Sequence, residues 1–185
     1  MNENPSCRVY LFRHGETANS KEVSFNGHFD VGLSAKGESQ FKEWAQVLKH
    51  EPFSAIYSSD LKRTRLGAQS LAEPHKLEPV AYPELRELCF GAWEGLSVSE
   101  VEKNYPKQLE ERMKNTETFQ VEGGETFDQL RNRVVPRFEE IISRHPNEHI
   151  AMVCHGGVNR VILSHLLKVP IKRIFRIKNL KLSST

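Results

Sequence analysis

Two short apolar runs each end in a histidine followed by glycine, and this pattern constrains the fold of the chain more than any other. The first run precedes His14-Gly15 and the second precedes His155-Gly156. Apolar runs of this length without helical periodicity are typical of buried strands. In open α/β sheets ligands bind outside the carboxyl ends of parallel strands, where a glycine lets backbone amides approach an anion. The pattern predicts a phosphate site, and for either run alone an ordinary strand end remains an alternative.

Length and cysteine content favour one intracellular domain. A chain of 185 residues buries roughly 70% of its unfolded surface, so it needs neither a metal nor a disulfide for stability. Its 3 cysteines show no CxxC spacing, which suits a reducing cytosol and makes a zinc site unexpected. We expect a single domain over residues 1–185. The chain ends soon after its last predicted strand, so a C-terminus that is truncated is one expectation.

Charge and hydropathy narrow the classes of partner. The chain has 26 Lys and Arg against 24 Asp and Glu, a net charge of +2, which does not suggest a nucleic-acid binder. The N-terminal residues lack the pattern of a signal peptide, and no apolar stretch approaches the roughly 18 residues of a membrane span. We therefore expect a cytoplasmic protein, without nucleic-acid or membrane partners, that is a monomer or a homodimer.

Strands alternate with amphipathic helices along the chain. Helical spacing of Phe41, Trp44, Ala45 and Leu48 predicts a helix with Ser34 as its N-cap. Further helices are predicted over residues 61–72, capped from residues 58–60, over 125–144 with a kink at Pro136, and after residue 156. Strands are predicted over residues 55–57 and 174–177, and residues 82–95 read as a loop. The alternation indicates an α/β fold, a three-layer α/β/α sandwich around a mostly parallel sheet.

Five consecutive residues, Arg13-His14-Gly15-Glu16-Thr17, resemble the signature of the histidine phosphatase superfamily, also called the phosphoglycerate mutase-like family. Other blocks resemble the family in the same order, so the resemblance covers nearly the whole chain. These blocks are Gly27 to Gly37, Ser58 to Arg63, Leu85 to Gly95, Glu122 to Glu125, and His155-Gly156.

The resemblance implies a phosphohistidine mechanism with His14 as the nucleophile. A neutral imidazole is a competent nucleophile near pH 7 when its other ring nitrogen is fixed by a hydrogen bond. Arg13, Arg63 and His155 would hold the phosphoryl group, since guanidinium groups match phosphate oxygens. Arg63 at a helix start could instead be a solvated cation. Because phosphoryl transfer needs mainly positioning and charge stabilisation, neither a metal nor another cofactor is expected.

The resemblance assigns the general acid to Glu87. A phosphate dianion nearby favours the protonated form of a carboxyl group, as donation to a leaving alcohol requires. Glu87 would then deprotonate the water that hydrolyses the phosphohistidine. The alternatives are Glu84, Glu94 and Glu16.

Three further residues are candidates for binding the phosphate or the substrate. Gly156 would offer a backbone amide, and His28 would contact the substrate, although a lone loop histidine is more often simply exposed. Family members often have asparagine six residues after the nucleophile, where this chain has Ser20. Either Ser20 or Asn19, one residue earlier, could serve there, and we name Asn19 as the candidate.

The substrate expected from the resemblance is a small-molecule phosphomonoester. Similar mutases carry a longer insertion and a tyrosine at the position of Phe90, which favours hydrolysis. Length and the Gly-His-Phe-Asp loop most resemble α-ribazole-5'-phosphate phosphatases of cobalamin nucleotide-loop assembly. Alternatives are a broad-specificity or sugar-phosphate phosphatase, a phosphoglycerate mutase, or a silent relative that binds phosphorylated ligands. A protein phosphohistidine phosphatase is disfavoured by the acid-bearing block from Leu85 to Gly95.

Overall fold

A four-stranded sheet forms the centre of the computed structural model, which describes residues 6–20 and 22–174. Its strand order is β1-β4-β2-β3, and the pairings within those residues are parallel. This confirms the predicted α/β class with a mostly parallel sheet. The strands are β1 (Arg8–Arg13), β2 (Phe53–Ser58), β3 (Val80–Ala81) and β4 (His149–Cys154).

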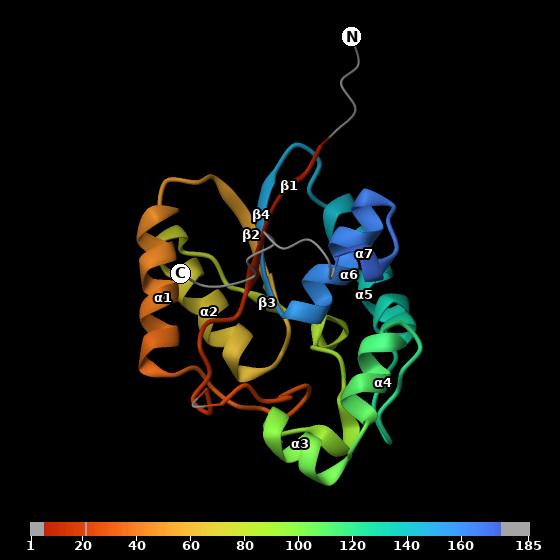
Figure 1. The fold of residues 1–185 in the computed structure, drawn as a ribbon. Coiled ribbons are helices and arrows are strands. Elements are labelled where there is room, and N and C mark those ends of the chain that lie inside the picture. Colours follow the sequence, from red (N-terminus) through yellow and green to blue (C-terminus); the bar gives the residue numbers. More distant parts are fainter. Residues whose placement is uncertain (1–5, 21, 175–185) are drawn as a thin grey trace.

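Helices cover both faces of the sheet (Figure 1). One face carries α1 (Ala35–Val47) and α2 (Lys62–Ala72), and the other carries α5 (Phe127–Ser143) and α6 (Gly156–Leu167). A further short helix, α7 (Ile171–Ile174), follows α6. The result is the three-layer arrangement that the alternation of strands and helices predicts.

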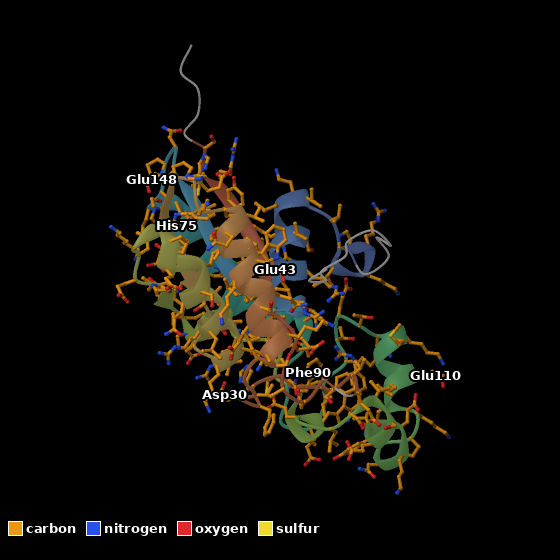
Figure 2. All side chains as sticks on the ribbon, turned by 90° about the vertical axis from the view of Figure 1, so that its left-hand side faces the viewer. Asp30, Glu43, His75, Phe90, Glu110 and Glu148 are labelled. Carbon is orange, nitrogen blue, oxygen red and sulfur yellow. The ribbon has the colours of Figure 1, made fainter. Side chains whose placement is uncertain are left out.

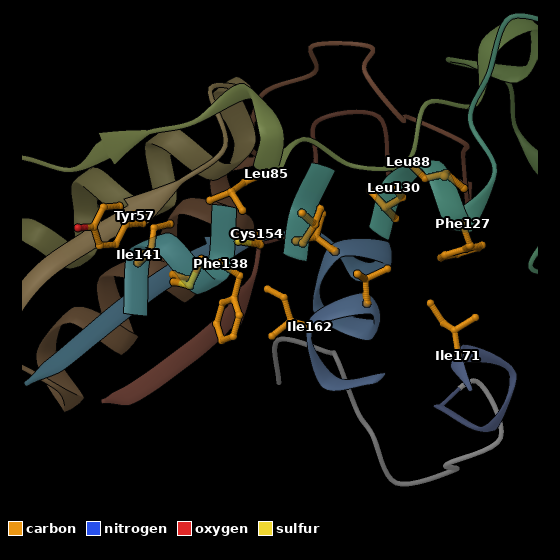
Figure 3. Close-up of a cluster of buried hydrophobic side chains, with 14 of the residues drawn as sticks. Tyr57, Leu85, Leu88, Phe127, Leu130, Phe138, Ile141, Cys154, Ile162 and Ile171 are labelled. Carbon is orange, nitrogen blue, oxygen red and sulfur yellow. The ribbon is translucent and has the colours of Figure 1, made fainter. Parts of the chain in front are cut away.

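Strand β4 explains why its apolar run is continuous. Successive strand side chains point to opposite faces, so a strand covered on both sides needs apolar residues at every position. Ile150, Met152 and Cys154 join the buried cluster formed with α5 and α6 (Figure 3). Ala151 and Val153 join the opposite cluster, formed with α1 and α2.

Most of the remaining elements lie beyond the carboxyl ends of the strands (Figure 1). They include α3 (Val98–Asn104), α4 (Gln108–Lys114) and two single turns, η2 (Pro83–Leu85) and η3 (Gly91–Trp93). Another turn, η1 (Glu73–His75), follows α2. A small third cluster around buried Trp93 packs this part together. The loop predicted over residues 82–95 therefore contains only short turns.

Several predicted helix features are confirmed. The Ser34 side chain accepts a hydrogen bond from the Gly37 amide at 3.1 Å and caps α1. The helix predicted over residues 125–144 is α5, which begins after a capping box at Thr126. Pro136 lies inside α5, and the helix continues to Ser143, while the kink expected at Pro136 stays a prediction.

Two predictions of local structure are wrong. Residues 58–60 do not cap α2, whose N-cap is Leu61 without a side-chain hydrogen bond. Ser59 Oγ accepts the Leu61 amide at 3.3 Å and also contacts His155, and Asp60 pairs with Arg86. Ile174 is not the start of a strand but the last residue of α7. A four-residue apolar run cannot distinguish strand from helix by periodicity. Residues 175–177 of that predicted strand lie outside the described residues.

A membrane-spanning helix needs about 20 predominantly apolar residues, which sets the standard for the helices of this chain. Over residues 6–20 and 22–174, none is long and apolar enough to cross a bilayer.

Candidate active site

Strand register brings the two histidines together. Arg13 on β1 pairs with Cys154 on β4, so the residues after them leave the sheet side by side. The His14 amide donates to the Cys154 carbonyl at 3.0 Å, and the His14 and His155 ring centroids are 5.4 Å apart. The predicted pairing of strand-end histidines is therefore present.

One hydrogen bond determines the tautomer of His14. Its Nδ1 lies 2.8 Å from the carbonyl oxygen of Gly15. A carbonyl only accepts, so Nδ1 must carry the hydrogen and Nε2 keeps its lone pair. Burial, followed by the positive charges of Arg63 and Arg13, lowers the pKa of His14 to about 3. The ring is therefore neutral near pH 7, as a nitrogen nucleophile must be.

The second histidine is completely buried. His155 is the N-cap of α6 and is 0% exposed. Its Nε2 lies 2.7 Å from Ser59 Oγ, whereas its Nδ1 has no hydrogen-bond partner among the described residues. Burial and the positive charge of Arg63 hold the pKa of His155 well below its ordinary value. One buried ring nitrogen of His155 is therefore without a partner, and His155 itself does not line the cavity beside His14.

Arg63 is not a solvated cation, since it is 1% exposed at the start of α2. Its Nη1 donates to the Phe29 carbonyl at 3.0 Å and its Nη2 to the Gly27 carbonyl at 2.6 Å. Its Nε has no hydrogen-bond partner among the described residues. Arg63 therefore holds the loop over residues 27–29, and its Nε donor has no partner there.

A cavity of about 480 Å³ opens beside His14. Arg13, Arg63, Glu87 and Gly156 line it, so most of the predicted site residues meet there. Phe90, on its wall, lies towards the same end of the molecule as Asp30, whereas Glu148 lies at the opposite end (Figure 2). The wall also includes apolar Val23 and Phe25 and polar Glu16, Lys36 and Gln40.

Glu87 lies at the amino end of α6. The Gly157 amide donates to its two carboxylate oxygens at 3.0 and 3.1 Å, and the Leu88 amide donates to Oε1 at 2.9 Å. A carboxylate is favourable there because the helix dipole and free amides face it. The bonds direct the carboxyl group to the cavity wall, which is the place that the prediction requires.

The alternatives to Glu87 are placed differently. Glu84 pairs with Arg137 at 2.6 Å, and Glu94 accepts the His28 amide at 2.7 Å. Neither lines the cavity. Glu16 does line it, but its carboxylate is engaged by Ser34 and Lys36.

Asn19 and Ser20 both line the cavity. The Asn19 amide group is held between Thr17 and Asn26, at 2.9 and 2.7 Å. His28 has a contact other than the predicted one: it does not line the cavity, and its Nε2 lies 2.8 Å from the Glu87 carbonyl. Its ring therefore contacts the backbone of the predicted acid.

Sequence reasoning missed Arg160. It lines the cavity one helical turn after Gly156, and a Cβ built on Gly156 would lie 3.2 Å from its Nη1. The signal was available, because residues four apart share one face of a helix. Lys36 and Gln40, one turn apart on α1, were missed in the same way.

Acidic, histidine and cysteine side chains are the usual ligands of a protein-bound metal ion. Across the described part of the chain, no three or more of them are grouped so as to hold a metal ion.

The chain is similar to known proteins over most of its length. The family model described as "Histidine phosphatase superfamily (branch 1)" matches residues 9–185. Phosphoserine phosphatase 1 of Hydrogenobacter thermophilus is 33% identical over 168 residues, which cover 91% of this chain and 80% of that protein. Phosphoglycerate mutase-like protein 4 of Arabidopsis thaliana is 36% identical over 157 residues, covering 83% of this chain and 68% of that protein.

A solved structure shares the fold over nearly the same length. The α-ribazole phosphatase of Shigella flexneri superposes with a TM-score of 0.82 and is 25% identical. The match covers 91% of this chain and 84% of that one.

Proposed function

The chain belongs to branch 1 of the histidine phosphatase superfamily and is a phosphoric monoester hydrolase, and we propose that it acts without a metal through a phosphohistidine on His14. The observation that carries the mechanism is the bond from His14 Nδ1 to the Gly15 carbonyl at 2.8 Å. That bond leaves Nε2 as the nucleophilic atom of a neutral ring.

The first step transfers the phosphoryl group to the enzyme. The His14 Nε2 lone pair forms the N–P bond while the P–O bond of the ester breaks. Glu87 in its protonated form gives its proton to the departing alkoxide. Bound phosphate favours that form because a dianion beside a carboxyl group disfavours its ionisation.

The second step returns the enzyme to its starting state. The Glu87 carboxylate takes a proton from water, whose oxygen forms a P–O bond as the N–P bond to His14 breaks. Inorganic phosphate leaves and Glu87 is again protonated, so protons balance over the cycle. The amides that hold Glu87 suit its ionised form in this step.

Charge on the transferring group would be stabilised by donors around His14. Arg13, Arg63 and Arg160 line the cavity. The roles proposed for Arg63 and His155 are supported by two buried nitrogens, Arg63 Nε and His155 Nδ1, which have no partners in the described structure. If Ser59 Oγ donates to His155 Nε2, the Nδ1 hydrogen is free for a phosphate oxygen. Fixed donors of this kind supply the stabilisation that phosphoryl transfer requires.

We propose α-ribazole-5'-phosphate as the substrate, which gives the protein a role in cobalamin nucleotide-loop assembly. The apolar wall formed by Phe25 and Phe90 supports this choice, because aromatic side chains offer a stacking surface for a flat ring. The likeness to the Shigella flexneri α-ribazole phosphatase supports it as well.

O-phosphoserine is the second candidate. Sequence identity favours it, at 33% to a phosphoserine phosphatase against 25% to the α-ribazole phosphatase. Lys36 and Arg160 on the cavity wall add positive charge that an amino acid carboxylate could meet.

Steady-state phosphate release separates these candidates. The panel contains α-ribazole-5'-phosphate, O-phosphoserine, 3-phosphoglycerate, fructose bisphosphate and p-nitrophenyl phosphate, with EDTA present and His14→Gln as the background. We expect the highest kcat/KM for α-ribazole-5'-phosphate and no effect of EDTA. A preference for O-phosphoserine would make that compound the substrate, and uniformly low rates would mean that the true substrate is not in the panel. Activity lost to EDTA and restored by a divalent ion would contradict the mechanism.

A further inference from the structure

We propose that Arg133 on α5 is a positioning residue that holds the general acid Glu87 at the reacting phosphate. The inference rests on the role proposed above for Glu87. Arg133 does not line the cavity and would not touch the substrate.

Glu87 lies on a segment without regular secondary structure of its own. The turn η2 ends at Leu85 and η3 begins at Gly91, so residues 86–90 belong to neither helix nor strand. Backbone carbonyls in such a segment need partners from elsewhere. Here Arg133 supplies them, by donating to the carbonyls of Glu84, Arg86 and Glu87, each at 2.8 Å.

Every N–H donor of the Arg133 guanidinium has a hydrogen-bond partner. It has five N–H donors, three of which make the carbonyl bonds. The other two bind Glu125, from Nε at 2.8 Å and from Nη2 at 2.7 Å. Glu125 in turn accepts the Cys89 amide at 2.9 Å, two residues beyond Glu87. The pair thus holds the acid-bearing segment on both sides of Glu87.

Glu87 is consequently fixed at both its backbone and its carboxyl group. Its carbonyl meets two side chains, Arg133 Nη2 at 2.8 Å and His28 Nε2 at 2.8 Å. Its carboxylate is held by the Gly157 amide. If the backbone bonds are lost, the carboxyl group can shift away from the leaving oxygen. A misplacement of about 1 Å can lower a rate roughly 100-fold, even when its cause lies far from the chemistry.

Arg137 provides a matched control one helical turn further along α5. It binds the side chains of Glu84 and Glu140 and lies over the Tyr82 ring at 4.3 Å. It has the same charge and a similar exposure, 21% against 20% for Arg133. These hydrogen bonds and this ring contact are with side chains, whereas Arg133 bonds to the carbonyls of residues 84–87. A general effect of lost charge or helix stability would therefore appear in both variants.

The experiment compares kcat/KM for two esters, since only a poor leaving group needs the proton of Glu87. p-Nitrophenyl phosphate releases a stable phenolate, whereas glycerol 2-phosphate releases an alkoxide. For glycerol 2-phosphate we expect Arg133→Gln to lower kcat/KM roughly 100-fold. Arg133→Lys should lower it less, because lysine keeps three of the five donors. The p-nitrophenyl ester should be affected much less, and Arg137→Gln should leave the ratio of the two esters at the wild-type value.

Two comparisons separate failure of this inference from failure of the proposed role of Glu87. Suppose that Glu87→Gln lowers kcat/KM far more for glycerol 2-phosphate than for p-nitrophenyl phosphate, while Arg133→Lys and Arg133→Gln lower it equally for both esters. Arg133 then does not position the acid. If Glu87→Gln itself slows both esters equally, the role of Glu87 is wrong and the inference falls with it. In the double variant Arg133→Lys/Glu87→Gln, we expect no added loss on glycerol 2-phosphate, whereas additive losses would overturn the inference.

Discussion

At the scale of single residues, function depends on which atoms already have partners. His14 and His155 are both neutral histidines beside arginines, yet their hydrogen bonds differ. The Gly15 carbonyl takes the Nδ1 hydrogen of His14 and leaves Nε2 nucleophilic. His155 is bonded at Nε2 and has its unpartnered nitrogen buried. The first arrangement suits attack on phosphorus, and the second suits donation to a phosphate oxygen.

Arg160 is the residue whose role is easiest to test independently. It lines the cavity near Gly156, so Arg160→Gln should weaken phosphate binding. Hydrogen bonds to charged groups are worth about 1.5–3 kcal/mol, which corresponds to a rise of roughly tenfold or more in KM. Competitive inhibition by inorganic phosphate should weaken in parallel.

Arg131→Gln is the control, because Arg131 is exposed on α5 and lines a different cavity. Equal KM values in wild type and Arg160→Gln would show that Arg160 does not contact the phosphate.

Motif resemblance found the residues that we propose to approach the phosphate, but it did not find Arg133, which we propose to support one of them. His14, Arg13, Arg63 and Glu87 are recognisable because each stands in a distinctive block of sequence. Arg133 stands in an ordinary amphipathic helix, and its three bonds to the carbonyls of residues 84, 86 and 87 exist only once α5 packs against that segment. No local sequence pattern predicts a partner of this kind.

At the scale of elements, the amino ends of two helices support the site. Helix α6 presents Gly157 to Glu87, and helix α1 packs against the segment that follows His14. The Gly37 position allows this close approach, because a Cβ built there would lie 2.1 Å from the carbonyl oxygen of Glu16. Backbone atoms cannot move aside as a flexible side chain can.

Gly37→Ala should therefore destabilise the contact between α1 and residues 14–17. Overpacking of this kind costs about 1–3 kcal/mol, measured as the free energy of unfolding in urea. Gly32→Ala is the control, since a Cβ built on Gly32 meets nothing within 4 Å. If Gly37→Ala is as stable as Gly32→Ala, helix α1 can shift without cost and the tight contact is not required.

Sequence periodicity predicted most elements well, because strands buried on both faces and amphipathic helices have clear patterns. It failed where a side chain had two competing partners or where a run was short. Ser59 looked like a cap for α2, but its hydroxyl lies at His155, which is 96 residues away in sequence. The four residues of α7 were too few to show a period.

At the scale of the whole molecule, the site is assembled from distant segments. Strand ends supply His14 and His155, the start of α2 supplies Arg63, and an irregular segment supplies Glu87. The parallel sheet brings these segments to one end, as parallel strands generally do. Burial of the histidines there links the site to the stability of the fold.

Stability should fall in mild acid for this reason. Burial lowers the pKa values of His14 and His155 in the folded protein, that of His14 to about 3. Unfolded histidines titrate near pH 6.5, so the unfolded state takes up protons first as the pH decreases. Stability is therefore full above about pH 6.5 and is lost progressively towards the folded pKa values.

Urea unfolding between about pH 6.5 and 4.5 measures this effect before most carboxylates titrate. We expect His14→Gln to show a shallower dependence on pH than wild type, since one of the linked protons is removed. Identical slopes for the two proteins would mean that His14 is not held neutral by the fold.

The most direct test of the account is to locate the phosphate on the enzyme during turnover. Wild type and His14→Gln would be mixed with excess substrate in EDTA, quenched within milliseconds in alkali, and mapped by peptide mass spectrometry. We expect a phosphohistidine at His14 in wild type, and neither label nor turnover in the variant. Phosphate on another residue, or turnover by His14→Gln at the wild-type rate, would contradict the proposed mechanism.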